Sequence, residues 1–313
     1  IYNKLQSRGY RVRFWTARYP TEIQLKTYAS NLAPIIGNTW THELVNKPTE
    51  PTRFDEKDLL EREASYGRLG FNMQFMLDTT LSDLNRYPLK LSDLTVMNLN
   101  PDNAPEKVIW ASSPELRYED LANVGLQGDN SYYRPMKIQG DWLPYTGSVM
   151  SIDPAGKSGA DETGYCVTKF LGGNIYVLAS GGFATGYTDH VLNKLVKIAK
   201  ENRVNKILIE ENFGMGMFEA LLKPYLTKNY NCSTECIRQT TNKHRRILDT
   251  LEPLISQHRI IFHKQVVKDD YELTNNLYSP EKALQYQLFY QLSRLQKGAN
   301  VLKHDDRLDT LQM

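Results

Sequence analysis

Apolar and polar positions alternate regularly in the second half of the chain. Residues 148–155 form a mostly apolar run, while residues 163–171 and 174–180 alternate between apolar and polar side chains. A period of two is typical of β-strands that bury one face. Gly172, Gly173 and Asn174 lie at the junction of the last two segments and predict a hairpin turn. The pattern therefore predicts three consecutive antiparallel strands.

Beyond these strands, segments with the apolar spacing of helices alternate with segments typical of strands. Residues 187–202 place several apolar side chains on one helical face, with Thr188 or Asp189 as the N-cap. Further strands are predicted at 204–212, 232–238 and 259–263, and further helices at 214–227, 244–255, 280–295 and from 303 onward. This order of elements is that of ribonuclease H-like nucleases. We expect an α/β fold with a mixed five-stranded sheet and helices on both faces.

The first half of the chain is less regular. A charged helix is predicted at 56–67, and residues 84–147 are rich in prolines and turn signals. The pattern changes at residues 138–147, so we predict a domain boundary between 147 and 148. The chain starts without methionine and stops inside a predicted helix. We expect it to be part of a longer protein.

Composition narrows the function classes. The 38 Lys and Arg residues nearly balance 36 Asp and Glu residues, which argues against binding of nucleic acid by bulk positive charge. Three cysteines, Cys166, Cys232 and Cys236, cannot all pair, so a disulfide framework is not expected. No apolar run approaches the ~20 residues of a membrane span, and no secretory signal is visible.

Carboxylates fall at three places where chemistry is expected. Asp153 ends the first predicted strand, Glu210 and Glu211 end the fourth, and three aspartates lie on the last helix. Hydrolysis of nucleic acid by two divalent ions needs carboxylates that converge from separate elements. Neighbouring strand residues point to opposite faces, so one glutamate of the pair should reach the site. The flanking residues are apolar on both faces and do not decide which one.

The last helix offers Asp305, Asp306 and Asp309. Asp306 and Asp309 are three residues apart and share a helical face, whereas Asp305 points away from them. Each acid taken alone also fits an ordinary role, as a turn former, a solvated strand end or a helix cap. Together, acids at two strand ends and on the late helix favour a metal site.

A competing motif lies at the first strand. Residues 151–158, SIDPAGKS, nearly match the phosphate-binding loop G-x-x-x-x-G-K-[ST]. Such a loop runs directly into a helix that holds the phosphate, but here an alternating strand follows. Cys232 and Cys236 lack a second pair for a zinc site, and no zinc-protease or serine-hydrolase motif occurs. We therefore expect neither ATP nor zinc to bind to these motifs.

A basic cluster surrounds the start of the helix predicted at 244–255. Its members are Arg238, Lys243, Arg245 and Arg246. Clustered Lys and Arg side chains suit contacts to DNA phosphates, although a solvated helical turn is an equally good interpretation.

Several segments resemble one family over nearly the whole chain. DPAGKSGADETGY (153–165), IEENFGMGMF (209–218), YQLSRL (290–295) and HDDRLD (304–309) resemble the nuclease domain of large terminase subunits from short-tailed, podovirus-type phages. FWTARYP (14–20) and residues 67–94 resemble the end of the ATPase domain and the linker of the same proteins. By this resemblance, residues 1–147 are the incomplete ATPase part with its linker and residues 148–313 the ribonuclease H-like nuclease.

The resemblance implies a two-metal-ion endonuclease that cuts concatemeric double-stranded DNA during ATP-driven genome packaging. Asp153, Glu210 and Asp306 match the family's catalytic metal ligands, with Asp309 as a further ligand. Asp305, Glu211 and Asp161 are second-tier candidates. The cofactor would be Mg²⁺ or Mn²⁺, in two ions, whereas ATP would bind only the missing half.

The family's partners are carried over in the same way. They are double-stranded DNA, the portal of the procapsid, the small terminase subunit and further copies in a ring, with no membrane. The expected place is the host cytoplasm, docked transiently on the procapsid and absent from the mature virion. Two alternatives stay open: a catalytically silent module that grips DNA or the portal, and another ribonuclease H-like enzyme such as a resolvase or transposase.

Overall fold

The computed structural model describes residues 8–78, 86–126, 131–155, 161–211, 216–239, 242–296 and 302–313. It divides into two compact units, of which the first ends at Arg86 and the second runs from Tyr87 to Met313. No helix in the described ranges is long and apolar enough to cross a membrane.

The first unit is small and helical. Its helices are α2 (Glu22–Tyr28), α3 (Pro34–Thr39) and α4 (Glu56–Gln74), with short 3₁₀ turns η1 (Ala29–Asn31) and η2 (His42–Leu44). Thr21 caps α2, because its hydroxyl accepts from the Gln24 N–H while the Gln24 side chain accepts from the Thr21 N–H. Two small apolar clusters, around Tyr28 and around Phe71, form its core.

The second unit is built on one large mixed sheet. Its strands are β1 (Thr95–Met97), β4 (Gly147–Asp153), β5 (Thr163–Leu171), β6 (Asn174–Phe183), β7 (Lys206–Glu210), β8 (Ser233–Ile237) and β9 (Ile260–His263). Their order in the sheet is β1-β9-β6-β5-β4-β7-β8. The predicted antiparallel strands β4, β5 and β6 are confirmed, and their β5–β6 hairpin turns at Gly172 and Gly173, both with φ in the left-handed region that glycine favours. A separate antiparallel ribbon pairs β2 (Asn103–Ile109) with β3 (Lys137–Pro144).

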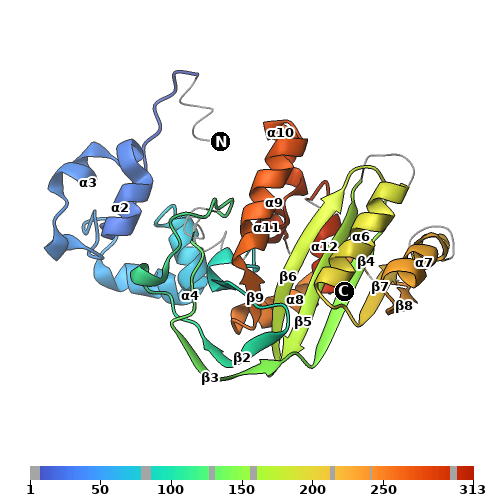
Figure 1. Ribbon diagram of the computed structural model, residues 1–313. Helices are drawn as coiled ribbons and strands as arrows, with labels where there is room; N and C mark the ends of the chain where they lie inside the picture. Colours follow the sequence, from blue (N-terminus) through green and yellow to red (C-terminus); the bar gives the residue numbers. More distant parts are fainter. Residues whose placement is uncertain are drawn as a thin grey trace. The chain divides into compact units, whose positions relative to one another are not determined.

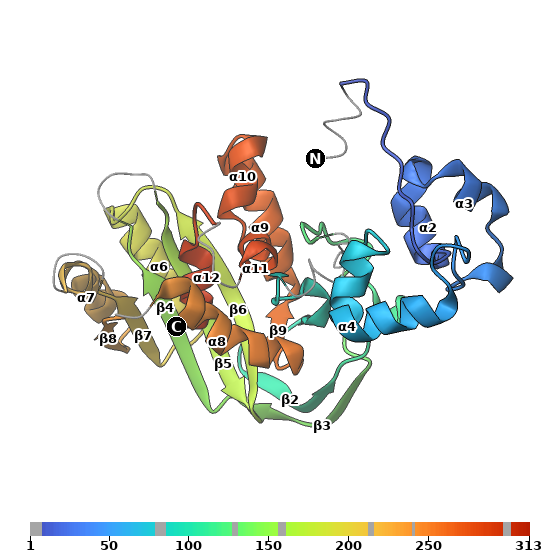
Figure 2. The same cartoon turned by 180° about the vertical axis from the view of Figure 1, so that it is seen from behind.

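Helices cover both faces of this sheet. They are α6 (Asp189–Glu201), α7 (Met217–Asn229), α8 (Lys243–Ser256), α9 (Lys264–Leu277), α10 (Pro280–Tyr286), α11 (Leu288–Arg294) and α12 (Asp306–Gln312), with 3₁₀ turns η3 (Leu91–Asp93) and η4 (Pro114–Leu116). Figure 1 shows α6 and α7 towards one face, and Figure 2 shows α8 and α12 over the other. The side chain of Thr188 caps α6, as one of the two predicted caps.

Alternation along the strands divides the core into two layers. Cys166 packs in the layer of α8, α9, α11 and α12, whereas the next residue, Val167, packs in the layer of α6 and α7. Met150 and Ile152 of β4 and Ile207 and Ile209 of β7 also belong to the α6–α7 layer. The residues between them on both strands therefore face α8 and α12.

Two predictions need correction: the number of strands in the sheet and the continuous helix at 280–295. Seven strands lie in the described part of the sheet, not five, because β9 and β1 add parallel pairs beyond β6 and satisfy its edge. The predicted helix 280–295 is broken at Gln287, where the backbone is extended. The carboxylate of Asp270 accepts from the N–H groups of Leu288 and Phe289 and starts a new helix there.

The compact units divide between Arg86 and Tyr87, and the domain boundary at 147/148 stays a prediction. Residues from Tyr87 onward belong to the unit that contains the large sheet. Strand β1 is part of this sheet because it pairs with β9, where Thr95 lies opposite Ile261. The assignment of residues 1–147 to an ATPase part with its linker remains a prediction.

Candidate metal centre

Two strand ends bring the first two acids together. β4 and β7 are parallel neighbours in which Ile152 pairs with Ile209. The residues that follow, Asp153 and Glu210, are the last of their strands and lie side by side. Because both alternate with residues of the α6–α7 layer, their side chains face α8 and α12. The structure thus brings Glu210, and not Glu211, next to Asp153.

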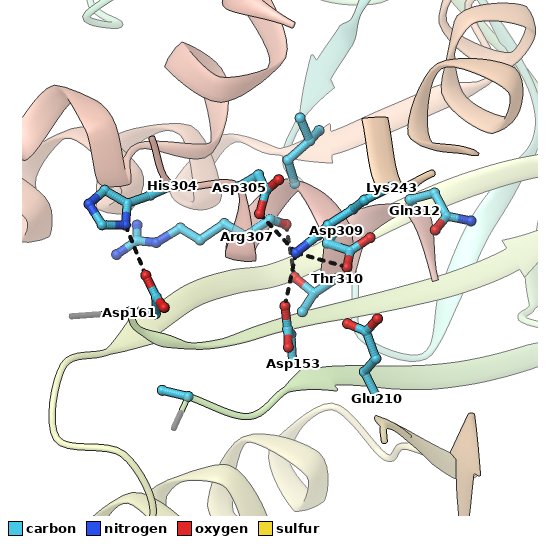
Figure 3. Close-up of polar contacts among 12 residues, drawn as sticks. Asp153, Asp161, Glu210, Lys243, His304, Asp305, Arg307, Asp309, Thr310 and Gln312 are labelled. Atoms are coloured by element: carbon cyan, nitrogen blue, oxygen red, sulfur yellow. Dashed lines mark hydrogen bonds and ion pairs between the residues drawn. The ribbon is translucent and has the colours of Figure 1, made fainter. Parts of the chain in front are cut away.

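Helix α12 brings the third acid. The helix lies against β4 and β5, and Gly164 of β5 permits the contact: a Cβ there would lie 2.8 Å from the Asp306 carbonyl oxygen. On this helix Asp309 is fully buried (0% exposed). Asp153, Glu210 and Asp309 each offer one oxygen, and these atoms lie within 4.8 Å of one another (Figure 3). We call these three residues the acidic triad.

Two cations from the start of α8 face the acidic triad. Lys243 Nζ lies 3.4 Å from Asp153 Oδ2 and 3.2 Å from Asp309 Oδ2, and it also pairs with Asp305 at 2.8 Å (Figure 3). Arg246 donates to Asp309 Oδ1 at 2.6 Å and lies 4.0 Å from Glu210. These two members of the predicted DNA-binding cluster therefore contact acids, while Arg238 and Arg245 are exposed.

Burial disfavours the charged forms of Asp153 and Glu210. Burial, and then the charges of neighbouring acids, raise the pKa of Asp153 to about 7, although Lys243 opposes the shift. The pKa of Glu210 rises to about 8 for the same reason, with Asp153 and Asp309 adding to the effect of burial. Burial alone would lower the pKa of Lys243, but the surrounding carboxylates raise it overall. The site thus favours additional positive charge.

Asp306 lies outside the group of three oxygens that Asp153, Glu210 and Asp309 form. The structure groups it with Asp161 and His304, whose ligand atoms also lie within 4.8 Å of one another. Burial raises the pKa of Asp306 to about 7, with Asp161 among the further causes. Asp305 precedes α12 and pairs with Lys243 and His244. Glu211 lies outside the acidic triad, and its N–H donates to the Ile237 carbonyl.

A buried ionic network fixes α12. Arg307 donates to Glu162 at 2.8 and 3.1 Å and to Asp270 at 2.9 Å, and all three side chains are at most 5% exposed. Glu162, Asp270 and Arg307 were not among the residues that the sequence pattern predicted to be functional. The sequence offered one signal for this network. Arg307 stands between the candidate ligands Asp306 and Asp309, on a helix that is otherwise apolar on one side.

The donors of the acidic triad fit a hard divalent cation. Three carboxylate oxygens converge, and Glu210 Oε2 is shielded from solvent without a hydrogen-bond partner in the described part of the chain. Mg²⁺ prefers a few carboxylates and leaves its other positions to water and phosphate. The chain can therefore supply the protein share of such a site.

The order of the strands and the acids at their ends define a ribonuclease H-like nuclease fold. A family model for the ribonuclease H-like domain of the bacteriophage T7 terminase matches residues 152–260. The terminase large subunit of Enterobacteria phage T3 is 40% identical over 320 residues, covering 100% of this chain and 54% of that protein. The chain belongs to the family of phage terminase large subunits, and it spans about half the length of the curated relative that it matches.

Solved structures resemble the fold more distantly. The human cytomegalovirus terminase nuclease domain, Mn-soaked and inhibitor-bound, is 11% identical with a TM-score of 0.40, covering 54% of this chain and 81% of that one. The large terminase nuclease from thermophilic phage G20c is 10% identical with a TM-score of 0.37, covering 72% of this chain and 96% of that one.

Proposed function

We propose that this chain carries the metal-dependent endonuclease of a terminase, which cuts concatemeric double-stranded DNA when genome packaging starts and ends. The observation that carries the proposal is the acidic triad: three buried carboxylates from β4, β7 and α12 with oxygens within 4.8 Å. The kinship with terminase large subunits supports DNA as the substrate.

The acidic triad and the two cations of α8 have different proposed roles. Asp153, Glu210 and Asp309 would hold the ion, which we propose to be Mg²⁺ or Mn²⁺. Such an ion lowers the pKa of a bound water and stabilises the oxygen that leaves phosphorus. We propose two such ions, and Asp153 would be among the residues that hold them. Lys243 and Arg246 balance the negative charge and hold Asp309 in place.

Asp309 replaces Asp306 as the proposed ligand from the last helix. Asp309 is buried beside Asp153 and Glu210, whereas Asp306 lies with Asp161 and His304. We expect Asp309→Asn to abolish plasmid cleavage in Mg²⁺ or Mn²⁺ and Asp306→Asn to retain measurable cleavage. Both variants are compared with the parent, with and without EDTA.

Two outcomes would contradict the proposal. If the parent binds DNA but never cuts it in either metal, the chain is a gripping module. If Asp309→Asn cuts as fast as the parent while Asp306→Asn is inactive, the ligand assignment from the sequence was the better one.

The proposed setting follows the family. We propose that the chain acts on the viral procapsid portal together with the small terminase subunit, as part of a ring, in the host cytoplasm and not in the mature virion. ATP hydrolysis is proposed only for the part of the relatives that this chain does not span.

A further inference from the structure

Two glycines lie opposite each other where α12 begins to pack on the sheet. Gly164 of β5 pairs with Gly182 of β6 in the ladder that joins these antiparallel strands. Two residues further along, Cys166 lies opposite Ser180, and Cys166 packs in the layer of α8, α9, α11 and α12. Since residues two apart on a strand share a face, the glycine pair also faces the layer of α12. The sheet is therefore thinnest at this pair.

Each glycine makes room for a different part of the α12 attachment. A Cβ at Gly164 would lie 2.8 Å from the carbonyl oxygen and 3.0 Å from the carbonyl carbon of Asp306, which are backbone atoms. A Cβ at Gly182 would overlap Glu162 Oε2 and lie 2.5 Å from Glu162 Cδ. Neither glycine has a positive φ, so the close approach, and not backbone freedom, accounts for the residue type.

Glu162 is the anchor that Gly182 accommodates. Its side chain is buried and accepts from Arg307 of α12 at 2.8 and 3.1 Å. It also accepts from the Tyr278 hydroxyl at 2.7 Å. A methyl group at position 182 would push this carboxylate away from both donors, and α12 would lose the anchor that Arg307 provides.

The first turn of α12 transmits such a displacement to the acidic triad. The Asp309 N–H donates to the Asp305 carbonyl at 2.8 Å, and Asp306 is the next residue of the same turn. A shift of the Asp306 carbonyl away from β5 would therefore move Asp309 away from Asp153 and Glu210. Functional constellations tolerate a displacement of only about 0.5 Å.

We propose that Gly164 and Gly182 are positioning residues of the metal centre. They determine how deeply α12 and its anchor Glu162 lie on the sheet, and this depth brings Asp309 to the other two acids of the acidic triad. The inference rests on the proposed function, because it takes the acidic triad to hold the ion of the nuclease.

Alanine substitution separates this role from ordinary packing. The matched control is Gly181, the neighbour of Gly182 on β6, which is also crowded: a Cβ there would lie 2.9 Å from the Tyr165 hydroxyl. Tyr165 packs in the α6–α7 layer, on the other face of the sheet. Gly181→Ala therefore places an equally unwelcome methyl group on the same strand without touching α12.

Binding of Mn²⁺ and cleavage are measured for all three alanine variants. We expect Gly164→Ala and Gly182→Ala to weaken Mn²⁺ binding in calorimetry by about tenfold or more, as outer contacts of metal ligands do. The kcat for plasmid cleavage should fall about 100-fold, because a misplacement of about 1 Å has an effect of that size, while the KM for DNA stays within about threefold. Gly181→Ala should keep both Mn²⁺ affinity and kcat within about threefold of the parent, even where its melting temperature falls.

A shorter anchor provides a rescue. Glu162→Asp removes one methylene and makes room for the methyl group that Gly182→Ala adds. The double variant Glu162→Asp/Gly182→Ala should therefore bind Mn²⁺ about fivefold more tightly than Gly182→Ala alone, as expected for two residues in contact. Glu162→Asp should give no such gain in combination with Gly181→Ala. If Gly164→Ala does not fold, Gly182→Ala and its rescue decide, since the neighbour there is a side chain that can move.

The outcomes keep the two proposals apart. Mn²⁺ affinity like that of the parent in Gly182→Ala, an equal loss in Gly181→Ala, or absence of the rescue would overturn the positioning role while cleavage by the parent still supports the nuclease. A parent chain that binds Mn²⁺ but does not cut plasmid DNA would contradict the nuclease alone, because the Mn²⁺ measurements need no cleavage.

Discussion

At the scale of single residues, the account depends on which acid reaches the site and in which protonation state. Asp153 and Glu210 are the last residues of adjacent parallel strands and point to the same face. Glu211 is their natural control, because it follows Glu210 directly and lies outside the acidic triad.

Replacement of the carboxylate by an amide should therefore have different effects on cleavage at Glu210 and at Glu211. Glu210→Gln and Asp153→Asn each remove a ligand and should lower the rate of plasmid cleavage more than about 100-fold, since even outer-shell changes cost 10–100-fold. Glu211→Gln should stay within about threefold of the parent, as neighbouring strand residues face opposite sides. The rates of plasmid cleavage in Mg²⁺ distinguish the two glutamates. A slower rate in Glu211→Gln than in Glu210→Gln would contradict the assignment of Glu210 to the acidic triad.

The raised pKa values predict how stability depends on pH without metal. The pKa of Asp153 is raised from 3.8 to about 7 and that of Glu210 from 4.5 to about 8. An acid with a raised folded-state pKa contributes stability that is complete below its unfolded pKa and lost as pH rises through the folded value. In EDTA, the melting temperature should decrease as the pH rises from about 4 to about 8.

The amide double variant supplies the comparison for this pH effect. Asp153→Asn/Glu210→Gln should show a flatter dependence over the same range, because neither amide titrates. Mn²⁺ should bind the parent more tightly as the pH rises, since binding requires both carboxylates to be ionised. An unchanged pH dependence in the double variant would show that other groups are responsible.

At the scale of elements, α8 and α12 determine the charge and position of the site. Lys243 at the start of α8 pairs with Asp153, Asp305 and Asp309 at 2.8–3.4 Å, where it supplies positive charge to the site. Arg307 of α12 is enclosed by Glu162 and Asp270, so the helix is fixed from within the core.

Removal of Lys243 should make the protein more dependent on metal. In EDTA, Lys243→Met should lower the melting temperature by roughly 5 °C, because the carboxylates lose a compensating charge. Mn²⁺ should restore it, so the metal-induced shift should exceed that of the parent. Lys264→Met, which loses a pair with half-exposed Asp120, is the control. A shift no larger than that of the parent would contradict this role of Lys243.

Removal of Arg307 should be costly for the fold. Arg307→Met would leave Glu162 and Asp270 buried without their cation, and loss of one partner in such a network costs about 3–5 kcal/mol. Urea denaturation measures this cost. Lys197→Met, which breaks an exposed pair with Glu201 on α6, should leave the free energy of unfolding almost unchanged. Equal values for both variants would mean that the network adds nothing.

Element boundaries also mark the limit of what the sequence could predict. The strand ends at Asp153 and Glu210 followed from local pattern and from the family resemblance. The sequence kept Asp306 and Asp309 together as candidates, because both share a helical face, whereas in the structure the packing of α12 on β5 places them in different groups of ligand atoms. The break at Gln287 depends on Asp270, which lies 18 residues before Leu288 on α9, and the three-residue strand β1 depends on pairing with β9.

At the scale of the whole molecule, the near match SIDPAGKS raises the question of nucleotide binding. Residues 156–158 lie outside the described residues, but β4 is paired with β5, and β5 is the next described element. A phosphate-binding loop requires a helix at that point. We therefore expect no binding of ATP at micromolar concentration by calorimetry, and no change in Lys157→Ala. Binding that the substitution removes would revive the phosphate-loop interpretation.

The two compact units contribute differently to this account. The unit from Tyr87 onward contains the sheet and the acidic triad, so the predictions on metal and cleavage concern that unit. The family relationship extends over the entire chain, which links the first unit to terminase large subunits as well.

We propose above all that Asp153, Glu210 and Asp309 hold a divalent ion. Anomalous X-ray scattering from crystals of this chain soaked in Mn²⁺ measures it most directly, because the map locates the ion itself. We expect a peak bounded by oxygens of these three residues, and loss of that peak in Asp309→Asn. A map with no peak at the acidic triad under saturating Mn²⁺ would contradict it.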